Sequence, residues 1–228
     1  MEIVKDFIRL FYPKLCAICQ NQLVTNEMVL CAFCRHDLPL IYYPDYKKNK
    51  ISRTFSGKII IEKAMSLLIY RREGRTKELI HQLKYKGNQE IGTFLGDWFG
   101  EILKENKEFS TVHCIIPVPL HKKKLKIRGF NQLTRFGERL SSHLQIPYIE
   151  NVLIKSTSTK TQTVKNRLDR FQNAKTKFQL TNTSLLENSH VLLIDDVITT
   201  GATLESCCNE LLKTKNIKIS VASMAFTE

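Results

Sequence analysis

The sequence predicts an α/β protein whose mostly parallel sheet is flanked by helices. From residue 59 onward, strand-like apolar stretches alternate with amphipathic helical stretches, and residues 191–194 read VLLI, the all-apolar composition of a buried parallel strand. Two C-x-x-C pairs add a small module in front of this domain. We therefore expect a helix and four-cysteine module over residues 1–45, a linker over 46–58, and the α/β domain over 59–228.

Size and charge limit the possible classes. The chain has 228 residues, 43% of them hydrophobic, and a formal net charge of +13, which suits one full domain with a small appendage. No apolar run approaches the roughly 20 residues that a membrane span needs. The first 15 residues form an amphipathic helical pattern, but Lys5, Asp6 and Arg9 interrupt it, so we expect a cytoplasmic protein without a secretory signal.

The first functional pattern is the cysteine spacing. Cys16 and Cys19 form one C-x-x-C pair, and Cys31 and Cys34 form a second pair after eleven intervening residues. Two such pairs can place four thiolates around one structural Zn²⁺, with His36 as a possible substitute ligand. The alternatives are four reduced thiols without metal, or two disulfides, which a cytoplasmic setting disfavours.

The elements of the α/β domain follow from periodicity. Leu79, Ile80 and Leu83 share one helical face, and Pro117 and Pro119 end a short buried strand because proline cannot donate to a ladder. The strands are expected at residues 59–70, 112–120, 191–197 and 217–226, and the helices at 75–85, 91–105, 129–144 and 203–214.

The second functional pattern is an acidic pair, Asp195 and Asp196, at the end of the most apolar strand, followed by Thr-Thr-Gly-Ala-Thr at 199–203. The carboxyl ends of parallel strands bind ligands in α/β folds. Gly201 lets the backbone approach a ligand, and the amides that open the next helix favour an anion. Carboxylates beside such a loop suit a sugar phosphate, which carries hydroxyls and a phosphate a few ångströms apart.

Other interpretations of the acidic pair are weaker. The G-x-x-x-x-G-K-[ST] pattern of a P-loop does not occur in the chain. A phospho-receiver domain needs about a hundred residues after such acids, whereas 32 residues follow Asp196. Two solvated acids that cap a strand and a helix remain an alternative.

The stretch VLLIDDVITTGAT resembles the thirteen-residue phosphoribosyl pyrophosphate motif of type I phosphoribosyltransferases, so the fold is expected to be of that type. The rest of the chain is similar to the ComF family of ComFC-like competence proteins. The similarity includes the double C-x-x-C, LKYKG at 83–87, IPVPL at 116–120, RGFNQ at 128–132, and the spaced residues Thr159, Gln162, Arg170, Asn173 and Phe178.

The resemblance implies a site and a role. Asp195 and Asp196 would bind the ribose hydroxyls, directly or through Mg²⁺, and the 5-phosphate would be held by Thr199, Thr200, Gly201, Ala202 and Thr203. The segment after Pro119 would contribute to the pyrophosphate side, and residues 155–173 would form a mobile flap. The implied role is DNA uptake in natural transformation, with phosphoribosyl pyrophosphate, single-stranded DNA and a competence DNA helicase as partners.

Three positions depart from the expected patterns. Lys155 stands where the family usually has arginine, and Lys165 stands where it usually has leucine. Because arginine and lysine are not equivalent at a bidentate phosphate contact, the flap is expected to grip its ligand differently. Purine-salvage relatives carry an acid at the position of Thr199, and its absence argues against purine salvage.

The positive charge is concentrated in two segments. Residues 121–139 and 155–177 each hold seven basic residues and one acidic residue, which together account for 12 of the 13 net charges. Solvated lysines, a pyrophosphate clamp and a nucleic-acid track are the three interpretations. We predict nucleic-acid contacts from these basic residues: Lys122, Lys123, Lys124, Lys126 and Arg170.

If the protein is an enzyme, the expected reaction displaces pyrophosphate from C1 of the sugar. Arg128 is the first candidate for the leaving-group contact and Lys84 the second, since both cations stand close to glycines. No general base emerges from the sequence. The alternatives are a phosphate-sensing or DNA-handling adaptor without catalysis, and a nucleotide-salvage phosphoribosyltransferase.

Overall fold

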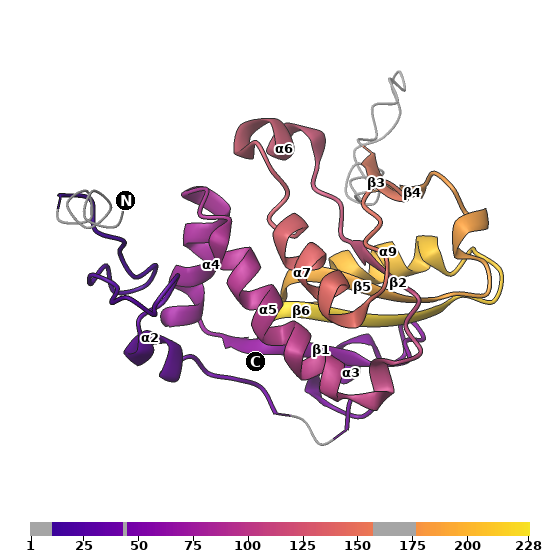
Figure 1. Cartoon of the computed structure of the whole chain (residues 1–228). Helices are drawn as coiled ribbons and strands as arrows, with labels where there is room; N and C mark the ends of the chain where they lie inside the picture. Colours follow the sequence, from indigo (N-terminus) through magenta and orange to yellow (C-terminus); the bar gives the residue numbers. More distant parts are fainter. Residues whose placement is uncertain (1–10, 43–44, 157–176) are drawn as a thin grey trace, which may run out of the picture.

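The computed structural model describes residues 11–42, 45–156 and 177–228, and a four-stranded sheet forms its centre (Figure 1). The strand order is β1-β6-β5-β2, and all three strand pairs are parallel. The strands are β1 (Ala64–Tyr70), β6 (Lys218–Thr227), β5 (His190–Ile198) and β2 (Cys114–Pro117). The parallel sheet predicted from the sequence is therefore confirmed.

Helices flank this sheet, with α4, α5 and α7 on one face and α9 on the other (Figure 1). The larger helices are α4 (Arg75–Tyr85), α5 (Glu90–Glu105), α6 (Lys122–Arg128), α7 (Thr134–Leu144) and α9 (Ala202–Leu211). Two short helices, α2 (Ala32–His36) and α3 (Lys50–Phe55), precede β1, and two 3₁₀ turns lie at Lys107–Phe109 and Ser184–Leu186. A separate antiparallel pair joins β3 (Leu153–Ser156) to β4 (Lys177–Leu180).

Small residues allow α5 and α7 to pack closely. Gly92, Gly96 and Gly100 lie four residues apart on α5, so they share the face that meets α7. A Cβ on Gly96 would lie 2.7 Å from the Cβ of Arg139 on α7. At this contact the Arg139 guanidinium donates to Asp97 at 2.6 Å.

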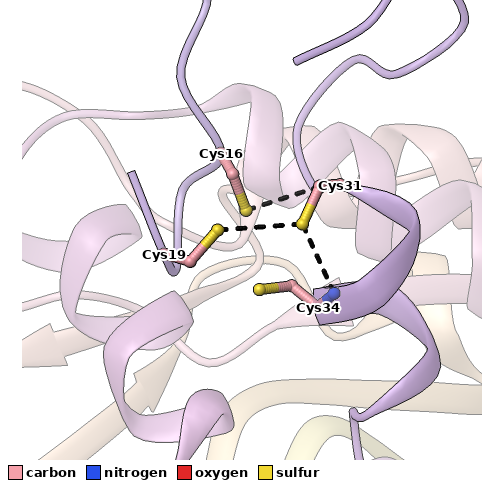
Figure 2. A group of neighbouring side chains, drawn as sticks. All are labelled: Cys16, Cys19, Cys31 and Cys34. Atoms are coloured by element: carbon pink, nitrogen blue, oxygen red, sulfur yellow. Dashed lines mark hydrogen bonds between the residues drawn. The ribbon is translucent and has the colours of Figure 1, made fainter. Parts of the chain in front are cut away.

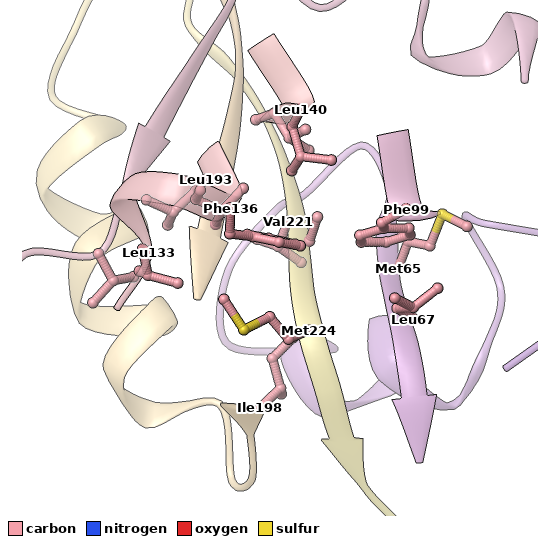
Figure 3. Packing of buried hydrophobic residues seen from close by; sticks show 14 of the residues in the cluster. Met65, Leu67, Phe99, Leu133, Phe136, Leu140, Leu193, Ile198, Val221 and Met224 are labelled. Carbon is pink, nitrogen blue, oxygen red and sulfur yellow. The ribbon is translucent and has the colours of Figure 1, made fainter. Parts of the chain in front are cut away.

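The core lies between these helices and the sheet (Figure 3). Phe99 from α5 and Phe136 from α7 are fully buried and stack with ring centroids 6.1 Å apart. Leu193 of β5 and Val221 of β6 are also fully buried in this region. The apolar strand predicted at residues 191–194 is therefore a central part of the core.

Several element predictions differ from the structure. The first strand begins at Ala64 and not at residue 59, and the helix predicted at 129–144 begins at Thr134. Helix α6 and the β3–β4 pair were not predicted. Residues 46–58, expected as a linker, contain α3, whose Ile51 and Phe55 are buried. In the described ranges, no helix combines the length and the apolar character that crossing a membrane requires.

The cysteine knuckle, residues 14–36, contacts the helices and leads directly into the sheet. After it, Leu40 pairs with Leu68 of β1 in an antiparallel bridge. Arg35 lies 5.1 Å from the Trp98 ring centroid on α5, and Arg75 of α4 donates to the Cys34 sulfur at 2.9 Å. The first ten residues of the predicted N-terminal helix lie outside the described residues.

Candidate functional site

The acidic pair lies near the carboxyl edge of the sheet, but inside the strand. We expected the strand to end at Ile194 or Val197, whereas β5 continues to Ile198, so Asp195 and Asp196 are strand residues. Asp195 pairs in register with Ser223 of β6. The regular backbone of the parallel sheet thus fixes the position of both acids.

Asp196 is the centre of a polar network that joins three separate segments. The Lys84 ammonium, at the end of α4, donates to Asp196 Oδ1 at 2.6 Å, and the Gln132 amide donates to the other carboxylate oxygen at 2.5 Å. The Arg128 guanidinium in turn donates to the Gln132 side-chain oxygen. Asp196 is 8% exposed and Gln132 is 7% exposed, so little water competes with these bonds. The structure therefore brings together the two predicted cations and one predicted acid.

Asp195 has a different environment. Burial, and after it the charge of Asp196, raise the pKa of Asp195 to about 8, although the Asp196 backbone N–H donates to it at 2.8 Å. The positive charges of Lys84 and Lys155 lower this pKa and oppose the main effect. The positive charge near these two adjacent carboxylates is thus too small to keep both ionised. A bound cation would add the charge that favours ionisation of both.

The loop after β5 has the geometry of an anion site. Gly201 adopts φ +74°, a left-handed conformation that favours glycine, and it precedes the first residue of α9. Gly201, the N-cap residue, offers no capping side chain, and the Thr200 hydroxyl accepts from the Ala202 N–H at the long distance of 3.5 Å. Thr199, Thr200, Ala202 and Thr203 are exposed around it. The structure therefore places the five predicted phosphate-loop residues at a helix N-terminus, where amides and hydroxyls suit a phosphate.

Helix α3 supports this loop from behind. A Cβ on Gly201 would lie 2.9 Å from a ring carbon of Phe55 and 3.0 Å from the Thr54 methyl carbon. The glycine is therefore required both by its φ angle and by this close contact. The six-residue helix inside the expected linker is part of the wall that shapes the loop.

A cleft of about 240 Å³ lies next to the polar network. Its wall combines cations and aromatic groups from two segments, the end of α4 and α6 with the residues after it: Lys84, Tyr85, Gly87, Lys124, Ile127, Arg128 and Phe130. The Arg128 guanidinium carbon lies 5.6 Å from the centroid of the Tyr85 ring. Such a wall suits a ligand that carries both negative charge and an apolar or planar part.

Helix α6 carries most of the predicted nucleic-acid residues. Lys122, Lys123, Lys124 and Lys126 are exposed, and none of the seven residues of α6 is buried. The helix stands away from the sheet (Figure 1), and Ile127 on it is 88% exposed. Arg170, and all of the expected flap except Lys155 and Ser156, lie outside the described residues.

The four predicted metal ligands converge (Figure 2). The sulfur atoms of Cys16, Cys19, Cys31 and Cys34 all lie within 4.8 Å of one another, and those of Cys19 and Cys31 are 3.7 Å apart. Four sulfurs at about 2.3 Å from a tetrahedral zinc ion would be separated by about 3.8 Å. These four thiols could therefore hold one metal ion, and their donor set fits zinc. All seven cysteines of the chain are free thiols.

Local hydrogen bonds favour the thiolate at Cys16, whereas burial opposes it at Cys34, whose pKa it raises to about 12. Burial opposes ionisation of Cys16, but backbone N–H groups of Cys19 and Cys31 lower its pKa to about 7. Arg75 donates to the Cys34 sulfur at 2.9 Å and is paired with Asp37. His36 is exposed and lies outside the cluster, so the candidate ligand set consists of the four cysteines.

The sequence did not identify two residues of the site. Gln132 is the last residue of RGFNQ, and only the fold shows that its amide joins Arg128 to Asp196. Tyr85 lies between Lys84 and Gly87 in LKYKG, and its exposed ring forms a wall of the cleft. Both residues belong to motifs that were selected for their cations. Membership of these motifs was therefore the sequence signal that could have identified Gln132 and Tyr85 as site residues.

Comparison with known proteins first defines the class. The Phosphoribosyl transferase domain family matches residues 134–227, which include β5, the loop after it, α9 and β6. Together with the parallel sheet and its flanking helices, this match shows that the chain contains a type I phosphoribosyltransferase-like domain.

Comparison with whole proteins then gives relatives that match most of the chain. Competence protein F of Haemophilus influenzae is 29% identical over 217 residues, which are 92% of this chain and 90% of that protein. Competence protein ComFC of Bacillus subtilis is 27% identical over 92% of this chain and 82% of its own length. DNA utilization protein YhgH of Escherichia coli O157:H7 is 30% identical over 59% of this chain and 60% of its own length. The chain is thus similar over most of its length to competence proteins F and ComFC, as its motifs predicted.

Proposed function

We propose that the carboxyl edge of the sheet binds phosphoribosyl pyrophosphate together with Mg²⁺, in a protein that acts in DNA uptake. The observation that carries the proposal is the network from Arg128 through Gln132 and Asp196 to Lys84, beside the N-terminus of α9. The 5-phosphate would occupy the loop at residues 199–203. Asp195 and Asp196 would bind the ribose hydroxyls or the magnesium ion.

The charges of the network support this arrangement. Lys84 and Arg128 lie next to the acids, so a pyrophosphate group that reaches them would stay within range of a cation held by Asp195 and Asp196. Magnesium supplies charge that neutralises pyrophosphate as it leaves C1 of the sugar. In this proposal Lys84 and Arg128 bind the leaving group, and Gln132 orients both Arg128 and Asp196. The acceptor would have to be a good nucleophile already or bring its own base, because the described site supplies no evident base.

The proposed role in DNA uptake is supported by the names of the relatives and by the charge of α6. Two relatives are competence proteins, and a third is a DNA utilization protein. The four exposed lysines of α6 would contact the phosphates of single-stranded DNA, close to the cleft formed by Tyr85 and Phe130. A competence DNA helicase is the proposed protein partner, with the zinc-bearing knuckle as its docking site.

Calorimetric titration with phosphoribosyl pyrophosphate and Mg²⁺ tests the sugar-phosphate site. The Asp195→Asn/Asp196→Asn variant should bind at least about 100-fold more weakly, because two charged ligands of the sugar or the metal are lost. Glu187→Gln, which changes an exposed acid before β5, is the matched control and should bind normally. Equal affinity of the double variant and the wild type would refute the proposed site.

Salt dependence tests the DNA site. Oligonucleotide affinity should fall steeply with salt, and Lys122→Gln/Lys123→Gln/Lys124→Gln should reduce the slope of the log–log plot by about 2, at about 0.7 per phosphate contact. The control Lys58→Gln/Lys104→Gln/Lys107→Gln removes the same charge from exposed positions elsewhere. If both triple variants behave alike, α6 is not the DNA site.

Two further measurements separate the functional classes. Pyrophosphate release on addition of candidate acceptors would identify an enzyme, whereas donor binding without release would identify an adaptor. A disrupted strain that loses transformation but grows on minimal medium would support DNA uptake. A nucleotide requirement of that strain would instead support salvage.

A further inference from the structure

A second polar cavity, of about 320 Å³, lies at the opposite edge of the sheet. It is formed where the four parallel strands begin, and each strand or the segment before it supplies lining residues. These residues are Lys47, Glu62, Lys63, Thr111, His113, Asn188, Ser189, His190, Asn216 and Lys218. Its volume is at the lower end of the range of roughly 300–1,000 Å³ for small-molecule sites.

The cavity is distinct from the site at the carboxyl edge. His190 begins β5, and Asp196 lies six residues further along the same strand. At about 3.3 Å per strand residue, the two positions are about 20 Å apart. The cavity therefore cannot be a subsite of the same bound sugar phosphate, and the inference below is independent of the proposed function.

The charge of the cavity is positive. Among its described lining residues, three are lysines and Glu62 is the acid. Lys63 is 7% exposed; its ammonium donates to the Glu108 carbonyl and lies 3.7 Å from the Glu108 carboxylate. Even with Glu108 counted, lysines outnumber carboxylates. An ammonium has three N–H donors, so Lys63 keeps donor capacity beyond its bond to the Glu108 carbonyl.

The two histidines and two asparagines give the cavity fixed polar walls. The His190 backbone N–H donates to His113 Nδ1 at 2.8 Å, so a neutral His113 carries its proton on Nε2 as a further donor. The His190 ring is held between the hydroxyls of Thr111 and Ser220 at 2.9 and 2.8 Å. Asn188 and Asn216 adopt left-handed backbone conformations directly before β5 and β6, and Asn216 donates to the Asn188 side chain at 2.9 Å.

We propose that this amino-edge cavity binds a phosphate group, either inorganic phosphate or the terminal phosphate of a small phosphoester. A phosphomonoester carries a charge of about −1.5 to −2 and three strong acceptor oxygens, which match the excess of lysines and the N–H donors of the wall. No Phe, Tyr or Trp side chain is among the described lining residues, which favours a compact anion over a nucleotide base.

The proposal is tested by NMR of the histidine ring signals during titration with inorganic phosphate, at constant ionic strength. The His113 signals, assigned with a His113→Gln variant, should shift and saturate. Lys47→Gln/Lys218→Gln should weaken this binding at least about tenfold, because two charge-assisted contacts are lost. Both lysines are exposed, so the fold should be retained. The matched control is Lys48→Gln/Lys215→Gln, which changes two exposed lysines nearby that do not line the cavity.

Parallel titrations with ribose 5-phosphate and pyrophosphate distinguish the sources of the phosphate group. Saturable His113 shifts with inorganic phosphate alone would identify free phosphate as the ligand. Equal or tighter binding of ribose 5-phosphate would identify a phosphoester, and either result supports the site. The proposal is overturned if none of the three anions gives a saturable shift, or if Lys47→Gln/Lys218→Gln binds as tightly as the wild type.

Discussion

The cysteine knuckle and the sheet domain are stabilised by different interactions. The knuckle, residues 14–36, buries four aliphatic side chains, Ala17, Leu23, Val29 and Leu30, and its two loops meet at four sulfur atoms and at the hydrogen bond from the Ala17 N–H to the Val29 carbonyl. The sheet domain encloses a continuous core in which Phe99, Phe136 and Leu193 are fully buried. We therefore expect the knuckle to depend on a bound metal ion, whereas the sheet domain depends on apolar contacts between segments far apart in the sequence. Because of this difference, we expect the two regions to unfold under different conditions.

The largest expected effect is that of metal removal on the knuckle. Structural zinc contributes about 10 kcal/mol or more in small zinc modules, so a strong chelator should unfold residues 14–36. Amide hydrogen exchange should show lost protection around Cys16 and Cys31 but retained protection in β5 and β6. Elemental analysis before chelation should give one zinc ion per chain, and Cys31→Ser should reproduce the loss. Protection of the knuckle that survives chelation would contradict a metal-dependent module.

The next effect acts on the sheet alone. Phe99→Ala removes a fully buried ring that stacks on Phe136, and it should reduce the free energy of unfolding by about 3–5 kcal/mol. Urea denaturation followed by circular dichroism measures this loss, and zinc content should stay unchanged. Ile60→Ala is the control, because Ile60 is 83% exposed and its truncation should cost less than about 0.5 kcal/mol. Zinc loss in Phe99→Ala would show that the two regions unfold together.

The two regions also differ in how far the sequence could predict them. The knuckle ligands are close in sequence, and spacing alone identified Cys16, Cys19, Cys31 and Cys34. Asp195 and Asp196 were identifiable for the same reason, since the strand, the acids and the glycine loop are contiguous. Local sequence patterns were therefore sufficient to predict candidate residues wherever one short segment supplies them.

Prediction failed where the chemistry depends on contacts between distant segments. Gln132 meets Asp196 across 64 residues of sequence, and no local pattern reports that contact. The cavity at the amino edge draws one to three residues from each of several segments, none unusual by itself. Helix α6 was missed because KKKLKIR lacks an apolar face, and α3 because six residues are too few for a clear period.

The pH dependence of stability should have opposite signs in the two regions. Asp195 has a folded-state pKa of about 8, above the ordinary value of 3.8, so the folded sheet holds this proton more tightly than the unfolded chain. Its contribution is complete below about pH 4 and is lost as the pH rises to about 8. The knuckle responds in the reverse direction, because acid protonates thiolates and releases the metal.

Asp195→Asn should therefore flatten the pH profile of sheet stability between about pH 4 and 8, by a few kcal/mol in magnesium-free buffer. Denaturant unfolding at several pH values measures the profile. Asp45→Asn is the matched control, because backbone N–H groups of Lys47 and Lys48 lower the pKa of this exposed acid. Its contribution changes only at lower pH, so its profile should follow the wild type above about pH 4. An unchanged slope in Asp195→Asn would show that Asp195 is ionised throughout this range.

The smallest effect concerns the contact between the two regions. Arg75 belongs to α4 of the sheet domain, yet it donates to the Cys34 sulfur at 2.9 Å and pairs with Asp37 of the adjoining segment. A cation at this position stabilises the thiolate, so Arg75→Met should weaken zinc binding about tenfold, which is about 1.4 kcal/mol. Competition with a zinc chelator measures this change, and Arg72→Met, at a nearby exposed arginine, should leave the affinity unaltered. If Arg75→Met binds zinc as tightly as the wild type, the Arg75 cation contributes nothing to the metal site, and contacts such as that of Arg35 with Trp98 would have to couple the two regions.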